Sequence, residues 1–462
     1  MASLTAPAAT AAAPSPSPSP SPSPSPSPSP SPSPATFKII NFGCWNQDAT
    51  YTSNEDKNPD FPRVIESILN ENGNIIIVNG DNYYQPEKNK EKFVIPEQIE
   101  AGLNILYSAI QKSTTTPEMI YLLTGNHDLE KTKPLNSSSS SSSSSELICE
   151  TIQIQKEFAT GKKITLPTNL VMFRIVNMGA SKTLIVMIDT NMYAGEKLEC
   201  YNELFDVDNR ISDTSDQKRI IAVLQQRQIN VINEYMLSNP GPYSNVICCG
   251  HHPLACFKKQ KKVEKEGKTK IKGGFESYSD AFYSLFWNNI KQFGNEITKY
   301  FYLCSDYHSY QEGIVTITVG SSIMTIQQYI VGTGGTDLDE PYDGVQLDKD
   351  DTTEGKYSNT ISIIINGVET ETETLTYTVT QLEYKKENGY IVLDVTDAGV
   401  DVRFVSVGPS KKKLSDKKLK KGNGSVGGSR KLRRRKTNKK YKYNTKRKPK
   451  SKKHKHCKTK RR

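Results

Sequence analysis

Histidine is scarce in this sequence, with only six among 462 residues. His454 and His456 lie in a basic C-terminal segment, and the other four fall within three short patterns. Residues 1–410 therefore contain no histidine outside those patterns. Because imidazole is the commonest protein ligand for metals, this concentration indicates a metal site built from loops.

Several other features are missing. No run of about 18 apolar residues is present, so we expect no membrane-spanning helix. The N-terminus lacks the basic start and continuous apolar core of a secretory signal. The eight cysteines are spaced neither as in a zinc ribbon nor as in a disulfide scaffold. We therefore expect an intracellular protein in a reducing compartment, not a secreted one.

Two segments of low complexity cannot bury apolar surface. Residues 14–34 alternate proline and serine, and residues 137–145 are all serine. The first is typical of an extended arm and the second of a flexible surface insertion. We therefore predict a disordered arm (1–35), a folded domain (36–408) with a flexible insertion (136–146), and a disordered tail (409–462).

Acidic residues are nearly absent from the tail. Residues 411–462 hold 27 Lys and Arg against one acid, Asp416, which gives +26. Subtracting this from the chain's +11 leaves −15 for residues 1–410. A long run of like charge cannot pack, and it binds polyanions such as nucleic acid by counterion release. A nuclear localisation signal, an acidic membrane surface, the chain's own acidic body and a tail without a partner all remain open.

Apolar runs alternate with helical patterns in the first part of the folded domain, and strands and turns fill residues 316–407. This order predicts two packed sheets covered by helices. The predicted helices are 64–71, 97–112 and 220–236, and the predicted strands before residue 316 are 37–42, 74–79, 119–123, 184–189, 245–249 and 301–304.

Polar motifs follow these strands. Residues 80–84 read Gly-Asp-Asn-Tyr-Tyr, 125–128 Gly-Asn-His-Asp, 250–253 Gly-His-His-Pro and 304–308 Cys-Ser-Asp-Tyr-His. Strand ends in α/β proteins gather ligand sites, so we expect these motifs to converge. Phosphate hydrolysis often uses two cations about 3.5–4 Å apart. The motifs supply the carboxylate to bridge such a pair, together with nitrogen and oxygen ligands.

The four motifs, in this order, resemble the calcineurin-like metallophosphoesterase superfamily. The spacing of Asp81 and Tyr84 is similar to its purple and tartrate-resistant acid phosphatase branch, as are residues 42–46 and 329–335. The resemblance covers about residues 36–407. It implies a four-layer αββα sandwich that hydrolyses phosphomonoesters at two metal ions, such as Fe, Zn or Mn.

The resemblance also implies roles for individual residues. Tyr84 and His308 would bind the first metal, Asn126 and His251 the second, and Asp81 would bridge the two. His127 would stabilise the transition state or protonate the leaving oxygen, oriented by Asp128. His252 would face the substrate or support a ligand.

Two positions depart from the family's pattern. Cys44 stands where the family has an aspartate, and Asp306 where it has a histidine. Both side chains can bind metal. A thiolate favours zinc or ferrous over ferric iron, whereas an added carboxylate should weaken phosphate binding. Asp48 could supply the missing carboxylate instead. Cys44 as an ordinary buried cysteine, and Tyr84 as a core aromatic, stay open.

These departures keep other functions open. One is a catalytically impaired metallophosphoesterase-like protein that binds nucleic acid through its basic tail. Another is a phosphodiesterase acting on nucleic acid captured by the tail. The arm, the serine run and the basic tail together resemble proteins of large DNA viruses, so the nucleus and the virion are the locations we expect.

Overall fold

The computed structural model describes part of the chain. The described residues are 35–46, 60–85, 87–88, 91–92, 94–112, 117–132, 148–167, 170–195, 200–201, 217–265, 268–336, 338–340, 353–365 and 368–408. They all lie within the unit Met1–Ser410. The Pro-Ser segment, the serine run, Asp48 and the basic tail lie outside them. Within the described part, no helix is long and apolar enough to cross a membrane.

The first sheet has six strands in the order β18-β17-β1-β2-β5-β6. β1, β2, β5 and β6 run parallel, and β17 and β18 continue the sheet antiparallel. β2 is apolar throughout because both of its faces are covered. The strands are β1 (Phe37–Phe42), β2 (Ile75–Val78), β5 (Met119–Leu122), β6 (Ile164–Thr165), β17 (Gly389–Thr396) and β18 (Gly399–Ser406), and the accompanying helices are α1 (Asp60–Asn70), α2 (Pro96–Lys112) and α3 (Glu150–Ala159).

The second sheet has eight strands in the order β15-β16-β13-β14-β12-β9-β8-β7. Its central strands β14, β12, β9 and β8 are parallel to one another. The strands are β7 (Val171–Met178), β8 (Ser181–Ile188), β9 (Asn245–Cys249), β12 (Lys299–Cys304), β13 (Tyr310–Val319), β14 (Ser322–Val331), β15 (Thr353–Ile365) and β16 (Val368–Lys385), accompanied by α4 (Asn191–Ala194), α6 (Gln217–Ser238), α7 (Asp280–Asn288) and the 3-10 helix η2 (Ile290–Phe293).

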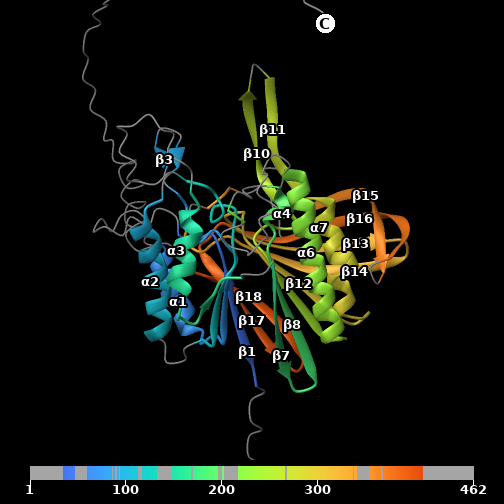
Figure 1. The fold of residues 1–462 in the computed structure, drawn as a ribbon, viewed down its shortest axis with the longest axis horizontal. Helices are drawn as coiled ribbons and strands as arrows, with labels where there is room; N and C mark the ends of the chain where they lie inside the picture. The colour runs from blue at the N-terminus through green and yellow to red at the C-terminus, as the bar shows by residue number, and fades with distance from the viewer. Residues whose placement is uncertain are drawn as a thin grey trace, which may run out of the picture. The chain divides into compact units, whose positions relative to one another are not determined.

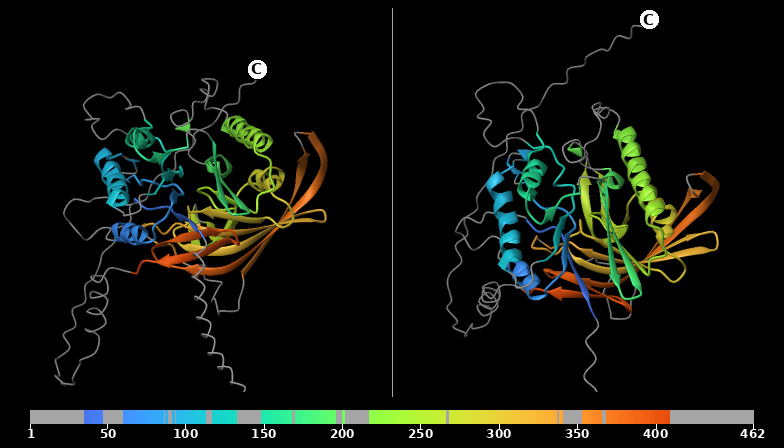
Figure 2. Two further views of the ribbon diagram at one scale, coloured as in Figure 1. Left: turned by 90° about the horizontal axis from the view of Figure 1, so that it is seen from below. Right: turned by 60° about the horizontal axis from the view of Figure 1, so that its bottom comes forward.

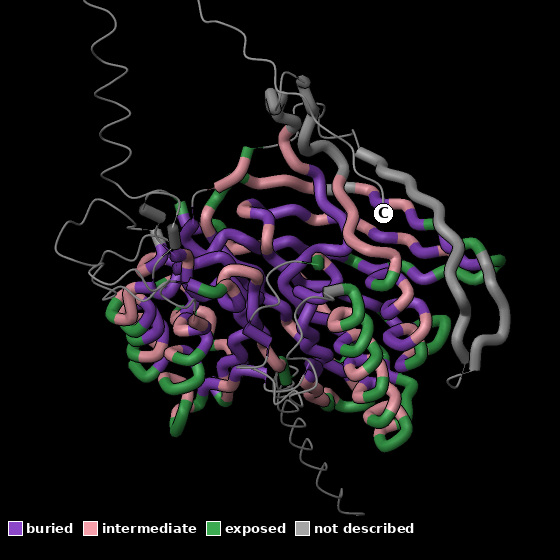
Figure 3. The backbone as a smooth tube through the Cα atoms, turned by 45° about the horizontal axis from the view of Figure 1, so that its top comes forward, coloured by how far each residue is buried: buried purple, intermediate pink, exposed green. Residues whose placement is uncertain are grey.

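The two sheets pack face to face with helices outside them (Figures 1 and 2). The rings of Tyr310 and Phe404, one from each sheet, stack 4.3 Å apart. On the outer side of the first sheet, Ser67 of α1 is hydrogen-bonded to Tyr390. On the outer side of the second, Tyr283 of α7 stacks on Tyr377. Buried residues gather between these layers (Figure 3). The predicted α/β sandwich is confirmed.

A long hairpin stands out from these layers (Figure 1). β10 (Ala255–Lys265) and β11 (Lys268–Ser277) pair antiparallel into a two-stranded ribbon between β9 and α7. The sequence pattern did not predict it, because lysine is depleted in strands and obscures the alternation. A second, very short hairpin joins β3 (Glu87–Lys88) to β4 (Glu91–Lys92).

One disulfide, Cys149–Cys200, joins the start of α3 to the segment beyond α4, with the two Cα atoms 5.5 Å apart. Spacing along the sequence could not predict this pairing, since connectivity does not follow from spacing. The bond stands against the expected reducing compartment. Among the described cysteines, the other five are buried free thiols: Cys44, Cys248, Cys249, Cys256 and Cys304.

Candidate metal centre

The loops that follow β1, β2, β5, β9 and β12 meet where the two sheets face each other. Within the first sheet, the Cys44 amide donates to the Gly80 carbonyl (3.1 Å). Between the sheets, the Ser305 hydroxyl donates to the Asn79 carbonyl (2.6 Å). The convergence that the motifs predicted is therefore present.

Glycine makes this closeness possible at two positions. A Cβ on Gly125 would lie 2.2 Å from Asp81 Oδ1 and 2.8 Å from His251 Cε1. Gly80 has φ +84°, and a Cβ there would lie 2.4 Å from the Gly125 nitrogen. Because no side chain fits at either position, only glycine lets the loops after β2 and β5 touch.

Backbone strain also gathers here. Among the described non-glycine residues, positive φ angles occur at Cys44 (54°), Asp81 (52°), Asp306 (52°) and Asn72 (54°). Such angles are uncommon for residues with a side chain, and strained backbone clusters at functional sites. Three of the four are predicted metal ligands, and both departures from the family's pattern are among them.

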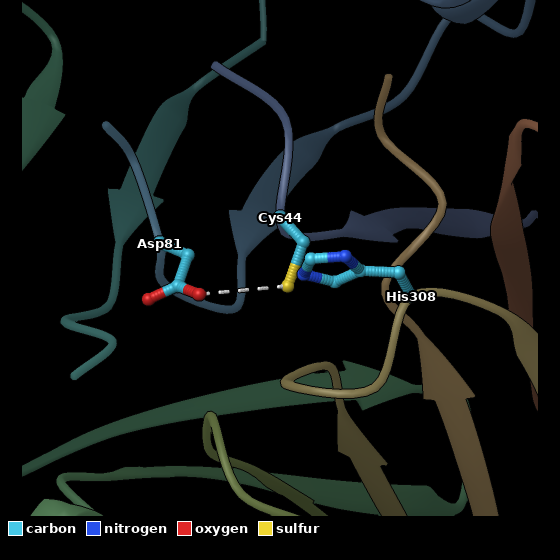
Figure 4. A group of neighbouring side chains, drawn as sticks. All are labelled: Cys44, Asp81 and His308. Carbon is cyan, nitrogen blue, oxygen red and sulfur yellow. Dashed lines mark hydrogen bonds between the residues drawn. The ribbon is translucent and has the colours of Figure 1, made fainter. Parts of the chain in front are cut away.

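The first group of donors is called here the thiol cluster: Cys44, Asp81, Tyr84 and His308. Ligand atoms of Cys44, Asp81 and His308 all lie within 4.8 Å of one another (Figure 4). Tyr84 Oη is 2.9 Å from His308 Nε2, and Cys44 Sγ is 3.9 Å from Asp81 Oδ2. Burial, and next the charge of Asp81, raise the pKa values of Cys44 and Tyr84. Both groups therefore keep their protons unless a cation displaces them.

The second group is called the imidazole cluster: His251, His252 and Asp306, whose ligand atoms also lie within 4.8 Å of one another. His251 Nδ1 lies 2.6 Å from the Asn79 carbonyl oxygen, so this nitrogen carries a proton and donates it. In the neutral ring, Nε2 then carries a lone pair. That lone pair lies 3.4 Å from Asp81 Oδ1 and 3.9 Å from Asp306 Oδ1.

The His251 Nε2 atom is buried and forms no hydrogen bond within the described part of the chain. In a neutral ring this lone pair would repel the two carboxylates, and a shared cation would turn the repulsion into attraction. A histidine whose other nitrogen donates to a backbone carbonyl is the usual form of a metal ligand. The residues present therefore fit a metal ion.

His252 differs from His251. The Thr190 hydroxyl oxygen accepts the backbone N–H groups of His251 (3.1 Å) and His252 (3.0 Å). Both of its lone pairs are thus used, so its own hydrogen points to His252 Nδ1, 3.0 Å away. Nε2 must then carry the ring proton. Burial lowers the pKa of His252 to about 3, which keeps the ring neutral. In this tautomer His252 Nε2 is a hydrogen-bond donor.

Asp306 has two partners that the sequence did not reveal. Tyr278 donates its hydroxyl to Oδ2 (2.6 Å), and Lys258 Nζ lies 3.8 Å from the same oxygen. Burial acts to raise the pKa of Asp306, but the charge of Lys258 and the hydrogen bond from Tyr278 act against burial, and the pKa lies well below its usual range. Lys258 thus offsets the added negative charge that we expected to weaken phosphate binding.

The turn after β5 carries Asn126 and His127. The His127 amide donates to Asp81 Oδ1 (3.1 Å), and the buried Asn126 side-chain oxygen lies in the same turn. His127 Nδ1 is 3.6 Å from Glu130 Oε2, and its ring centre is 4.7 Å from that of Tyr84. His127 therefore lies beside the thiol cluster, next to a carboxylate that no motif indicated.

The Asp128 carboxylate is held by three amide groups, and its orienting role toward His127 stays a prediction. The carboxylate accepts the amides of Gly125 (2.8 Å) and Asn82 (3.0 Å) and the side-chain amide of Gln155 (2.8 Å). Burial raises the pKa of Asp128 to about 6. Asp128 thus holds the two glycine loops together, and Glu130 Oε2 lies 3.6 Å from His127 Nδ1.

No family model matches the sequence, and no curated protein matches it. A solved structure titled "Structure of PhoD" is similar to this chain, with a TM-score of 0.39 and 10% identity, covering 84% of this chain and 78% of that one.

Proposed function

We propose that the chain is a metal-dependent phosphoesterase of the metallophosphoesterase type, which hydrolyses phosphomonoesters at a dinuclear centre as acid phosphatases do. One observation carries the proposal: the two oxygens of Asp81 face different clusters. Oδ2 faces Cys44 Sγ (3.9 Å), and Oδ1 faces His251 Nε2 (3.4 Å). A carboxylate in this position suits the bridge between two cations.

The clusters divide the ligands between the two ions, with Asp81 common to both. When bound, the cations would polarise phosphoryl oxygens and lower the pKa of a water molecule. Cys44, Tyr84 and His308 would hold one ion, and Asn126, His251 and Asp306 the other.

Two histidines would serve the substrate. His127 would protonate the leaving oxygen, and Glu130 would hold its ring by the contact at Nδ1. His252 would donate its Nε2 hydrogen to a phosphoryl oxygen. Because that hydrogen is buried and has no acceptor within the described part of the chain, a phosphate oxygen would satisfy it.

The donors also bear on metal identity. Sulfur from Cys44 makes the first position softer than a carboxylate would, which favours zinc or ferrous iron there over ferric iron. The second position has only oxygen and nitrogen donors, which suit Zn, Fe or Mn.

A second candidate function follows from the two positions, 44 and 306, that depart from the family's pattern. With Cys44 and Asp306 in place of the family's residues, the domain would bind metal or phosphate without turnover and act through nucleic acid held by residues 411–462. Lys258 beside Asp306 favours the enzyme, because it restores positive charge where the replacement removed it.

Elemental analysis combined with turnover tests the proposal. Purified protein should contain two metal ions per chain and hydrolyse p-nitrophenyl phosphate faster than bis(p-nitrophenyl) phosphate. Asp81→Asn keeps the size of the side chain and removes the bridging charge, so we expect loss of both metals and at least a roughly 1,000-fold fall in turnover. Metal-free protein without turnover, unchanged by Asp81→Asn, would refute the enzyme. Preference for the bis-ester would support a phosphodiesterase instead.

A further inference from the structure

The β10–β11 ribbon begins and ends at the candidate metal centre. β10 starts two residues after Pro253, and the residue that follows β11 is Tyr278, which hydrogen-bonds Asp306. Lys258 of β10 also reaches Asp306, and it pairs with Glu276 of β11 at 3.1 Å. The base of the ribbon is thus a wall of the site, and its far end stands away from both sheets (Figure 1).

The strand register sorts the ribbon's outer residues into two unequal faces. Three directly opposed pairs share one face: 261 with 272, 263 with 270, and 265 with 268. Five of these six residues are lysine, and the sixth is Val263. The pairs 262 with 271 and 264 with 269 share the other face, which holds one lysine and one glutamate. The register therefore assigns most of the ribbon's lysine positions to one face.

The lysine face continues to the metal centre. Every second residue of β11 from 268 to 276 lies on it, because the one irregularity in the register places its extra residue on β10. Lys258 is paired with Gly274, so it belongs to the same face. Lys258, which contacts Asp306, is thus the lysine of this face that lies at the metal centre.

This arrangement of lysines destabilises the pairing of the two strands when no ligand is bound. Lys261 is directly opposite Lys272, and Lys265 is directly opposite Lys268. Like charges in opposed positions destabilise a strand pair. A run of negative charge laid along the face would remove that repulsion.

We propose that the ribbon binds a polynucleotide and presents its terminal phosphate to the metal centre. This inference rests on the proposed function and names its substrate class. Residues 261 to 265 span about 14 Å, more than one phosphate group can cover. A nucleic-acid strand carries a phosphate about every 3.4 Å of helix axis, so several would lie against the face together.

Hydrogen exchange on the full-length protein tests the binding surface. Adding a 5′-phosphorylated single-stranded oligonucleotide should slow exchange across residues 255–277. The variant with Lys261, Lys265, Lys268, Lys270 and Lys272 all changed to Gln should lose this protection, and the salt dependence of log K should flatten by about 0.7 per lysine removed.

A matched variant changes five lysines of the basic tail to Gln: Lys452, Lys453, Lys455, Lys458 and Lys460. It should weaken overall binding and keep the protection of the ribbon. Unchanged exchange in the ribbon with the oligonucleotide would overturn the proposal. Equal protection by polyglutamate or by anionic lipid vesicles would overturn the choice of nucleic acid.

Turnover separates this inference from the proposed function. In the ribbon variant, kcat/KM for the terminal phosphate of the oligonucleotide should fall about tenfold or more, because several phosphate contacts are lost. The value for p-nitrophenyl phosphate should stay unchanged, since none of the five lysines belongs to the centre. If neither the unaltered protein nor any variant hydrolyses an ester, the enzyme proposal fails. Hydrogen exchange still tests whether the ribbon binds the oligonucleotide. Equal falls for both substrates would refute delivery by the ribbon.

Discussion

The thiol cluster, which includes Asp81, and the imidazole cluster beside it are held differently. In the thiol cluster the donors bond to one another, as Tyr84 does to His308. In the imidazole cluster they bond outward: His251 to Asn79, His252 to Thr190 and Asp306 to Tyr278. Outward bonds fix a ligand's orientation before a metal arrives.

This difference in hydrogen bonding indicates how each cluster would bind its metal ion. The imidazole cluster presents a lone pair and a charged carboxylate in place. Cys44 and Tyr84 of the thiol cluster have raised pKa values and must first lose protons to a cation. We therefore expect the imidazole cluster to bind metal readily and the thiol cluster to decide which metal is chosen.

Among variants that affect one cluster only, the largest expected effect comes from Asp306→Asn. Removing this charge should empty the imidazole cluster alone, so the metal content falls from two ions per chain to one and turnover falls at least about 100-fold. Metal analysis and p-nitrophenyl phosphate hydrolysis measure both effects. Asp394→Asn, which removes a carboxylate near Arg403 in the first sheet, is the control and should change neither. Two retained ions would contradict the assignment of Asp306.

Cys44→Ser should weaken the thiol cluster by a smaller amount, about 10- to 100-fold in metal affinity. Loading the protein with cobalt(II) gives a direct readout, because a thiolate ligand adds a near-ultraviolet charge-transfer band. That band should vanish in Cys44→Ser and persist in Cys304→Ser, which changes a buried thiol bonded to the Tyr329 carbonyl. A band absent from the unaltered protein would show that Cys44 is ordinary core.

His252→Asn should have the smallest effect. Asparagine keeps an acceptor near Thr190 and removes the Nε2 donor, so we expect both metals to stay and KM to rise about tenfold, the worth of one hydrogen bond to a charged group. Metal content and KM for p-nitrophenyl phosphate are the measurements. Loss of an ion would mean that His252 is a ligand and that its proton lies on Nδ1.

Much of the fold could be predicted from the sequence. The strands 37–42 and 245–249 coincide with β1 and β9, and the helix 97–112 with α2 to within one residue, because apolar spacing determines which surface is buried. The β10–β11 ribbon was missed because its many lysines obscure the alternation of a strand. The Cys149–Cys200 bond depends on how distant segments meet, which local patterns do not contain.

The candidate site also has one part that the sequence predicted and another that it did not. Motifs after buried strands predicted that Asp81, His251 and His308 would lie together, because adjacent parallel strands end at one edge. Lys258, Tyr278 and Glu130 carry no motif, and their contacts depend on the bulge in β10 and on the turn after β5. The partners of Asp128 depend on a three-way contact of loops that no spacing encodes.

The site spans a seam between two sheets, with Asp81 supplied by one and His251 and Asp306 by the other. Before the two sheets pack together, each carries only part of the ligand set. An ion can therefore bind to the complete set only after the sheets have packed. An ion bound across the seam would favour the native state by mass action, so metal supply would set how firmly the halves stay joined. Removing the ions with a chelator would then weaken the contact between the two sheets before either sheet unfolds.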